Sequence, residues 1–283
     1  MNSSNPSVEQ NRDLRDIAGP IVLCGAGKMG TALLEGWLQS GLAPDRIVVL
    51  EPHPGPAIAA LAARGVRLNP HAGTLENVAA IVIAVKPQVA AETLPALAPM
   101  TGPATVVVSV MAGRTLQFLA GALPHAGALV RAMPNTPAAI GRGITVAVPL
   151  HASEAKRELA YRLLLATGTV EWVADETLMD AVTAVSGSGP AYVFLLAEAL
   201  TRAGVAAGLP QTLAAKLARE TVAGAGELLR HSPLDAATLR ENVTSPGGTT
   251  AAALEVLMRA DGLPALLREA VAAATERSRK LAG

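Results

Sequence analysis

The stretch Ile21–Gly30, IVLCGAGKMG, decides the fold. Four apolar residues of the kind that form a buried strand run directly into a G-x-G-x-x-G pattern. In this pattern the first glycine permits a tight turn, the second lets the backbone approach a pyrophosphate, and the third lets the next helix pack closely. The N–H groups at the start of that helix attract the anion. We therefore predict a dinucleotide-binding turn made by Gly25, Ala26, Gly27, Lys28, Met29 and Gly30; a merely tight strand-to-helix turn is the alternative.

The segments around this turn repeat its organisation. From Gly19 to about Ala174, short runs such as RIVVLE, AAIVIAV and ATVVVSV alternate with helical patterns such as TALLEGWLQS and SEAKRELAYRLLLATG. Near-continuous apolar strands with helical crossovers are typical of a parallel sheet covered on both faces. Residues 19–174 are thus expected to form an α/β domain of the Rossmann type, a doubly wound parallel sheet.

The rest of the chain follows different patterns. After Asp175 strand signals end and helical segments follow one another, with Pro or Gly at most of the joints. We expect residues 175–283 to form an all-helical C-terminal domain and residues 1–18 to be a flexible tail.

The composition excludes several classes of protein. Of the 283 residues 51% are hydrophobic and only 2% aromatic, and 23 Lys plus Arg balance 23 Asp plus Glu. We therefore expect no nucleic-acid partner, because neither base stacking nor a basic groove has the residues it needs. No apolar run reaches the roughly 18 residues of a membrane span, so no membrane partner is expected. The single cysteine, Cys24, excludes an internal disulfide and favours a reducing, cytoplasmic location.

The second strand ends in Glu51, which bears on the choice of cofactor. An acidic residue about 20 residues after the glycines accepts hydrogen bonds from the adenosine ribose and repels a 2′-phosphate. Glu51 therefore favours NADH. His53 and Arg64 follow it and are potential partners for a phosphate, so NADPH remains the alternative.

Five further motifs, in their order and spacing, make the chain resemble the pyrroline-5-carboxylate reductase family from about Ile21 to Lys280. The motifs are AVKPQ (Ala84–Gln88), SVMAG (Ser109–Gly113), RAMPNTPA (Arg131–Ala138), DAVTAVSGSGPAYVF (Asp180–Phe194) and VTSPGGTTAAALEVL (Val243–Leu257). The last two are the specific ones, since many dehydrogenases have a dinucleotide turn.

The resemblance implies an NAD(P)H-dependent enzyme of proline biosynthesis whose helical domain interlocks with that of a second subunit. The partners would then be a small cyclic imino acid and a second copy of the chain, in a homodimer that assembles further in many relatives. The cofactor would contact Ala84, Val85, Lys86, Pro87 and Ala112, with Asn135 near the nicotinamide end. The substrate would contact Ser245, Gly247, Gly248, Thr249 and Thr250. Relatives that use NADPH tend to have Ser, Thr or Arg in place of Glu51, and some use an Asn near the stretch NPHAG for the ribose.

The Ser-Pro-Gly-Gly loop has no titratable side chain, and the chemistry of imine reduction explains why. The cofactor supplies the hydride, and an imine nitrogen is basic enough to arrive protonated, so a strong general acid is dispensable. Bare glycine amides and the N-terminus of the following helix suit a carboxylate. We assign to the Thr250 hydroxyl the hydrogen bond to the ring nitrogen. The alternative is that the loop is only a turn with a threonine helix cap.

The predicted activity is reduction of 1-pyrroline-5-carboxylate to L-proline with NADPH or NADH. A related imine reductase, a 3-hydroxyacid dehydrogenase and a non-catalytic dinucleotide-binding regulator are the alternatives. A hydroxyacid enzyme needs an acid to protonate an alkoxide, and none accompanies SGSGP or SPGGTT. No metal is expected, because the five histidines lack ligand spacing. Cys24 is expected to be a small buried side chain.

Overall fold

The computed structural model describes residues 13–282, which divide into two compact units. The first comprises the described residues up to Gly187 together with the segment from Thr275 onward, and the second is Ser188–Ala274. The boundary expected at residues 174 and 175 lies just before the helix that begins near Glu176, and the contacts assign 175–187 to the first unit.

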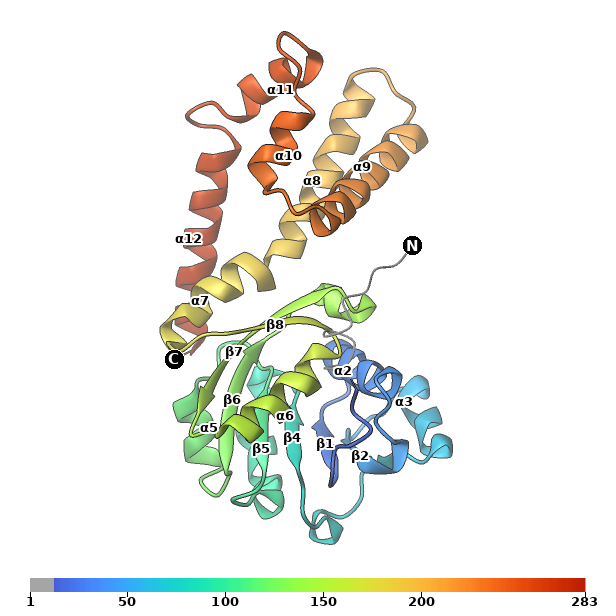
Figure 1. The fold of residues 1–283 in the computed structure, drawn as a ribbon, viewed down its shortest axis with the longest axis vertical. Helices are drawn as coiled ribbons and strands as arrows, with labels where there is room; N and C mark the ends of the chain where they lie inside the picture. The colour runs from blue at the N-terminus through green and yellow to red at the C-terminus, as the bar shows by residue number, and fades with distance from the viewer. Residues whose placement is uncertain (1–12, 283) are drawn as a thin grey trace. The chain divides into compact units, whose positions relative to one another are not determined.

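A sheet of eight strands forms the centre of the first unit, in the order β3-β2-β1-β4-β5-β6-β7-β8 (Figure 1). The strands are β1 (Ile21–Cys24), β2 (Ile47–Leu50), β3 (Arg67–Leu68), β4 (Ala80–Ile83), β5 (Val106–Ser109), β6 (Ala128–Met133), β7 (Gly143–Leu150) and β8 (Gly168–Trp172). The chain runs outward from β1 in both directions, which is the doubly wound arrangement that the apolar runs predict.

Alternate side chains of each central strand enter different cores, which explains why these strands are apolar throughout. In β1, Ile21 and Leu23 belong to one buried cluster, whereas Val22 and Cys24 belong to the other. Successive strand residues point to opposite faces, so a sheet covered on both sides needs apolar residues at every position. The predicted fold class, a Rossmann-type sheet followed by a helical domain, is confirmed.

Helices cover both faces of the sheet. On one face lie α2 (Lys28–Gln39), α3 (Pro56–Leu61) and α6 (Glu154–Leu165), and the indole N–H of Trp37 on α2 donates to the Leu163 carbonyl of α6 at 2.8 Å. Figure 1 shows α2 and α6 on the same side of the strands. On the other face lie α4 (Ala90–Thr93), α5 (Leu116–Ala122) and the start of α7 (Met179–Val182).

One strand pair departs from the predicted parallel sheet. β7 runs antiparallel to β6, with Met133 opposite Val146, whereas the other pairs are parallel. The link from β6 to β7 is only the short 3₁₀ helix η7 (Thr136–Ile140) and its flanks, too short for the crossover that a parallel neighbour needs.

The residues expected to form the N-terminal tail fall into two parts. Residues 1–12 lie outside the described residues. Leu14 is fully buried, Ile17 is nearly so, and the Leu14 N–H donates to the Ser40 carbonyl at 2.9 Å. Leu14 and Ile17 therefore pack in the same buried cluster as Ile21 and Leu23, because burial of their apolar side chains is favourable.

The second unit consists of helices only. It contains α8 (Gly189–Ala206), α9 (Gln211–His231), α10 (Ala236–Asn242), α11 (Thr249–Leu257) and the first part of α12 (Leu263–Ala282). α8 and α9 pack closely, since a Cβ on Gly204 would lie 3.2 Å from the Cβ of Ala214. The sequence patterns predict helices over 191–207, 211–229, 249–259 and 265–280, which agree with α8, α9, α11 and α12 within a few residues, and they predict none at α10. Within the described chain no helix has the length and apolar character to cross a membrane.

The glycine-rich stretch SGSGP has an irregular helical backbone. After α7 the residues Thr183–Gly187 form a π-helix, and α8 begins just after Ser188. A Cβ on Gly187 would lie 2.5 Å from Cε of Met133, in the RAMPNTPA motif. Gly187 therefore lets this segment approach the end of β6 closely.

Candidate functional site

The glycine turn after β1 fits a dinucleotide, as the surroundings of each glycine demonstrate. Gly25 has a φ of +93°, and a Cβ there would lie 2.9 Å from the carbonyl of Ala84. A Cβ on Gly30 would lie 2.1 Å from the carbonyl oxygen of Gly25. A Cβ on Gly27 would meet nothing within 4 Å, so this backbone faces open space. These are the three roles that the motif requires: turn, close helix packing, and an uncovered approach for a phosphate.

The N-terminus of α2 supplies donors to that open space. The helix begins at Lys28, its N-cap is Gly27, no side chain caps it, and its first turn has no acidic residue. Backbone N–H groups at an uncapped helix start attract an anion, and the helix dipole adds to the attraction. The turn and helix α2 can therefore hold a pyrophosphate.

A cavity of about 710 Å³ opens beside the turn, at the carboxyl ends of β1, β2 and β4. This edge of a doubly wound sheet is where such folds bind ligands. The predicted cofactor residues that line it are Gly25, Gly27, Glu51, Ala84, Val85 and Lys86. The structure thus brings segments far apart in the sequence around one cavity large enough for a cofactor.

Glu51 is tied to the glycine turn. Its Oε2 accepts a hydrogen bond from the Ala26 N–H at 2.9 Å, and its Oε1 accepts one from the His53 N–H at 3.1 Å. Both backbone groups of Glu51 are bonded to the side chain of Asn69: the Glu51 N–H donates to Oδ1 at 2.8 Å, and Nδ2 donates to the Glu51 carbonyl at 2.9 Å. The carboxylate is therefore held in one place at the wall of the cavity.

Asn69 lies in the candidate site, and the sequence marks it only as the first residue of the stretch NPHAG. It lines the cavity and has a φ of +45°, a conformation that Asn adopts more readily than most residues. The stretch NPHAG begins with it, and an Asn directly after a short strand was the available signal. The apolar wall also went unassigned; it includes Val89, Leu97 and Met100, which lie in or between short helical turns without a strong periodic pattern.

Cys24 is one of the residues that line this cavity, and 3% of its surface is exposed. Burial, with a smaller contribution from the negative charge of Glu51, raises the pKa of its thiol to about 12. A thiol in this environment stays protonated and is not a nucleophile. The prediction of a small buried side chain is confirmed for Cys24.

The remaining predicted cofactor residues lie outside the cavity lining. Ala26 and Lys28 line an adjoining shallow hollow with Gly27, and Met29 packs against the core. Ala112 is exposed in the loop after β5. The side-chain oxygen of Asn135 accepts the Ile144 N–H at 3.0 Å, so this side chain holds the start of β7.

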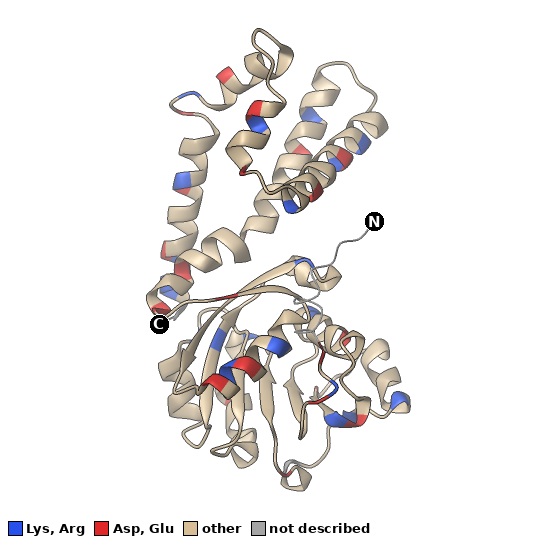
Figure 2. Ribbon diagram, in the orientation of Figure 1, with Lys and Arg blue, Asp and Glu red and all other residues tan. Residues whose placement is uncertain are grey.

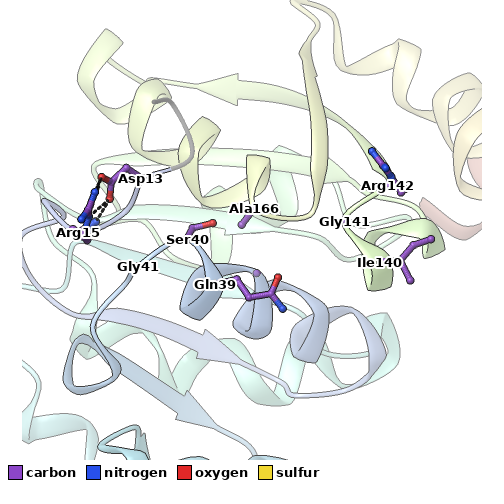
Figure 3. A pocket seen from close by; sticks show the side chains of 10 residues that line it. Asp13, Arg15, Gln39, Ser40, Gly41, Ile140, Gly141, Arg142 and Ala166 are labelled. Atoms are coloured by element: carbon purple, nitrogen blue, oxygen red, sulfur yellow. Dashed lines mark hydrogen bonds and ion pairs between the residues drawn. The ribbon is translucent and has the colours of Figure 1, made fainter. Parts of the chain in front are cut away.

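A second hollow of about 750 Å³ contains none of the predicted site residues (Figure 3). Figure 3 shows Arg15 and Asp13 pointing toward each other, with Gln39, Ile140 and Arg142 around the same space. The Arg15 guanidinium donates to Asp13 at 2.9 Å from Nε, which lowers the pKa of Asp13 to about 2. This hollow lies away from the glycine turn and offers no uncapped helix start to an anion.

The predicted substrate loop belongs to the second unit. Gly247 has a φ of +69°, and the Gly248 N–H closes a turn by donating to the Ser245 carbonyl at 3.0 Å. Gly248 is the N-cap of α11, and no side chain caps that helix. Thr249 is exposed and Thr250 half-buried. The threonine cap considered for this loop is thus absent, and the donors of α11 stay available to an anion.

Charges of both signs are mixed along the helices (Figure 2). Both α6 and α9 carry basic and acidic residues at short intervals, as α6 does at Lys156, Glu158 and Arg162. Over the described residues, no three His, Cys, Asp or Glu side chains gather as they would around a metal ion.

Two family models match the chain. Residues 176–281 match the model described as "Pyrroline-5-carboxylate reductase dimerisation", and residues 20–113 match the one described as "NADP oxidoreductase coenzyme F420-dependent". The second match covers the glycine turn, Glu51 and the AVKP segment. The first covers the helical unit and the substrate loop.

Relatives and solved structures agree with these matches. The pyrroline-5-carboxylate reductase of Synechocystis is 41% identical over 264 residues, covering 92% of this chain and 97% of the relative. That of Pseudomonas aeruginosa is 39% identical over 93% of this chain and 96% of its own length. The structure of the pyrroline-5-carboxylate reductase of Coxiella burnetii, 31% identical, has a TM-score of 0.87 and covers 94% of this chain and all of that one.

A Rossmann-type unit with an open glycine turn, followed by a helical dimerisation unit, defines an NAD(P)-dependent oxidoreductase. At about 40% identity over nearly the whole chain, the particular family is also shown. This chain belongs to the pyrroline-5-carboxylate reductase family.

Proposed function

We propose that the cavity beside Gly27 and the loop Ser245–Thr250 are the cofactor site and the substrate site of this reductase. The enzyme reduces the C=N bond of 1-pyrroline-5-carboxylate to give L-proline, and NAD(P)H supplies the hydride when bound. The observation that supports the proposed site most strongly is the open space in front of Gly27. The other two glycines of the turn, Gly25 and Gly30, have no room for a side chain.

The cofactor is proposed to bind through two sets of groups. Gly25–Gly30 and the first N–H groups of α2 hold the pyrophosphate, and Ala84–Pro87 form the wall along the cofactor. Lys86 places a positive charge in that wall. Ala112 and Asn135 stay in the proposal as residues near the nicotinamide end.

The substrate carboxylate is proposed to bind at the loop before α11. Ser245 offers a hydroxyl, Gly247 and Gly248 offer backbone uncovered by side chains, and Thr249 and Thr250 begin an uncapped helix. Thr250 is the proposed catalytic residue: its hydroxyl hydrogen-bonds the ring nitrogen and orients the C=N bond. An already protonated imine needs orientation rather than a strong acid, which accounts for a loop without titratable groups.

NADH is the proposed preferred cofactor. Glu51 is fixed at the cavity wall by two backbone N–H groups, and a carboxylate held there repels a 2′-phosphate. Of the two residues considered as partners for that phosphate, His53 lines the cavity, whereas Arg64 lines a different hollow beside α3. The solved relative from Plasmodium falciparum has NADP bound, and NADPH is the alternative cofactor for this chain.

The chain forms a homo-oligomer through its helical unit. Among the described residues of Ser188–Ala274, buried positions are confined to Ala214, Ala218 and Gly262. Large apolar side chains are exposed there, and Phe194 has 68% of its surface uncovered. Such a surface requires a partner. We propose a homodimer that assembles further, and a cytoplasmic location consistent with the single cysteine.

One assay tests the function. Reduced-nicotinamide absorbance is followed with 1-pyrroline-5-carboxylate and each cofactor, and then with 3-hydroxyacids and oxidised cofactor. We expect turnover with the imine and a larger kcat/KM with NADH. Turnover with a hydroxyacid alone would favour a dehydrogenase, and cofactor binding without any turnover would favour a regulator. Either result would overturn the proposed function.

A further inference from the structure

The turn that carries Lys86 is held from outside the cavity by an arginine. Arg114, directly after the SVMAG motif, donates two hydrogen bonds to the Pro87 carbonyl oxygen, from Nε at 3.1 Å and from Nη2 at 2.6 Å. Its guanidinium also lies over the ring of Phe118, 4.7 Å from the centroid. Arg114 thus joins the AVKP segment to the start of α5, two parts of the chain that are adjacent only in the fold.

The turn itself has few bonds of its own. Pro87–Val89 is a single 3₁₀ turn, η4, whose first residue has no N–H to donate. The Val89 N–H donates to the Lys86 carbonyl and the Ala90 N–H to the Pro87 carbonyl, and the Thr93 hydroxyl donates to the Val89 carbonyl at 2.9 Å. Lys86 directly precedes Pro87, and Val89 lies two residues after it. Both Lys86 and Val89 line the cavity. A shift of Pro87 would therefore move both ends of this part of the wall.

The charge of Arg114 is not used in an ion pair, since no carboxylate lies within salt-bridge distance of it in the part of the chain that the structure describes. A planar guanidinium between an aromatic face and a carbonyl has its orientation fixed on both sides. The same residue in a purely electrostatic role would not need two bonds to one neutral acceptor.

We infer that Arg114 is a positioning residue for cofactor binding: by holding the Pro87 carbonyl it keeps the Lys86–Val89 wall of the cavity in the shape that binds the dinucleotide. The inference rests on the proposed cofactor site. Arg114 does not line the cavity and touches neither cofactor nor substrate in this assignment.

The test compares Arg114→Met and Arg114→Lys with a matched control. Arg157 stacks on Trp172 in the same way, 4.9 Å from the ring centroid, on a helix that does not line the cavity. Arg157→Met removes an equivalent stacked guanidinium without touching η4. The dissociation constants of NADH and NADPH are measured directly by quenching of protein or cofactor fluorescence, together with Tm, KM and kcat for the full-length enzyme.

We expect Arg114→Met to raise the dissociation constant and the KM of both cofactors about five- to tenfold, with kcat changed less than about twofold. Arg114→Lys should recover only part of this affinity, because an ammonium lacks the planar fork. Arg157→Met should leave cofactor affinity unchanged. A raised dissociation constant with nearly unchanged kcat means that the variant binds the cofactor less tightly. Loss of a catalytic group would lower kcat instead.

Two results would overturn the inference. Cofactor affinity unchanged in Arg114→Met would remove Arg114 from binding, and full recovery in Arg114→Lys would assign its effect to charge rather than position. Gly27→Val separates this failure from failure of the proposed site. If Gly27→Val abolishes cofactor binding while Arg114→Met does not alter it, the inference alone is wrong; if neither variant alters binding, the cavity is not the cofactor site and the inference falls with it.

Discussion

The carboxylate of Glu51 accepts a hydrogen bond from the backbone N–H of Ala26, inside the glycine turn, at 2.9 Å. The residue that we propose to select between NADH and NADPH is therefore tied to the turn that we propose to hold their common pyrophosphate. Because Asn69 holds the backbone of Glu51 on both sides, the carboxylate has little freedom to turn away from a 2′-phosphate. If Glu51 selects the cofactor as proposed, it does so from a fixed position.

Replacing Glu51 with Ser should shift the preference toward NADPH. Loss of the negative charge removes the repulsion of a 2′-phosphate and leaves a hydroxyl that can bind it. We expect the ratio of kcat/KM for NADPH to that for NADH to rise at least about tenfold, equivalent to about 1.4 kcal/mol. Steady-state kinetics with both cofactors measure this ratio. Glu76→Ser, which removes an exposed carboxylate outside the cavity lining, is the control for net charge and should leave the ratio as it is.

A side chain added at Gly27 should abolish cofactor binding, whereas one added at Gly30 should destabilise the fold. Gly27 has an extended backbone with φ −69° and open space around its Cβ position, so Gly27→Val should keep Tm within a few degrees and abolish cofactor binding. Gly30→Ala forces a Cβ against the Gly25 carbonyl and should destabilise the fold by about 2–3 kcal/mol. Thermal unfolding and cofactor titration of both variants check this. Normal cofactor binding by Gly27→Val would contradict the assignment of the turn.

Thr250→Val should lower turnover without weakening cofactor binding. The valine keeps the shape and loses the hydroxyl proposed to bond the ring nitrogen. We expect kcat/KM for the imine to fall at least about tenfold, the effect of one lost hydrogen bond to a charged group. Thr212→Val is the matched control, because Thr212 is also the second residue of an uncapped helix in the same unit. Wild-type turnover in Thr250→Val would remove Thr250 from the mechanism.

The Cys24 thiol should be unreactive in the native protein. Its pKa is raised from 9.0 to about 12, mainly by burial, so the folded protein keeps the thiol protonated where an unfolded chain ionises it. Burial of the protonated thiol therefore contributes its full stabilisation of the fold below pH 9, and this stabilisation is lost as the pH rises toward 12. A disulfide reagent at pH 8–9 should label the unfolded chain rapidly and the native chain at less than about a tenth of that rate. Rapid labelling of the native protein would mean that the region around Cys24 opens to solvent, and it would contradict this prediction.

The order of elements could be read from the sequence because each depends on local patterns. The run Ile21–Cys24 has the continuous apolar character of a strand buried on both faces, and the glycines after it occupy the positions that the turn demands. Helices α8, α9 and α12 are long and bounded by Pro or Gly, so their limits are also encoded nearby. The short α10 has no such strong periodicity, and it was missed.

The candidate site was predictable only where a motif marks it. Gly25, Gly27, Glu51 and Lys86 were identified from their motifs, and the structure brings them around one cavity. Asn69 has no motif of its own, and its bonds to Glu51 join positions 18 residues apart. The apolar wall at Val89, Leu97 and Met100 becomes a wall only when the sheet edge brings it opposite the glycine turn.

By itself the sequence determined the strand–turn–helix unit at Ile21–Gly30, the change to helices after the sheet and the family to which the chain belongs. The first two follow from the spacing of neighbouring residues, which fixes local backbone geometry, and the family follows from the resemblance of five motifs to those of its members. Only the tertiary structure decided that β7 runs antiparallel to β6, that Glu51 bonds to Ala26 and that Arg114 holds Pro87. Each of these depends on which distant segments come to lie side by side, and that choice is made by burial over the whole sheet rather than by any short stretch of chain.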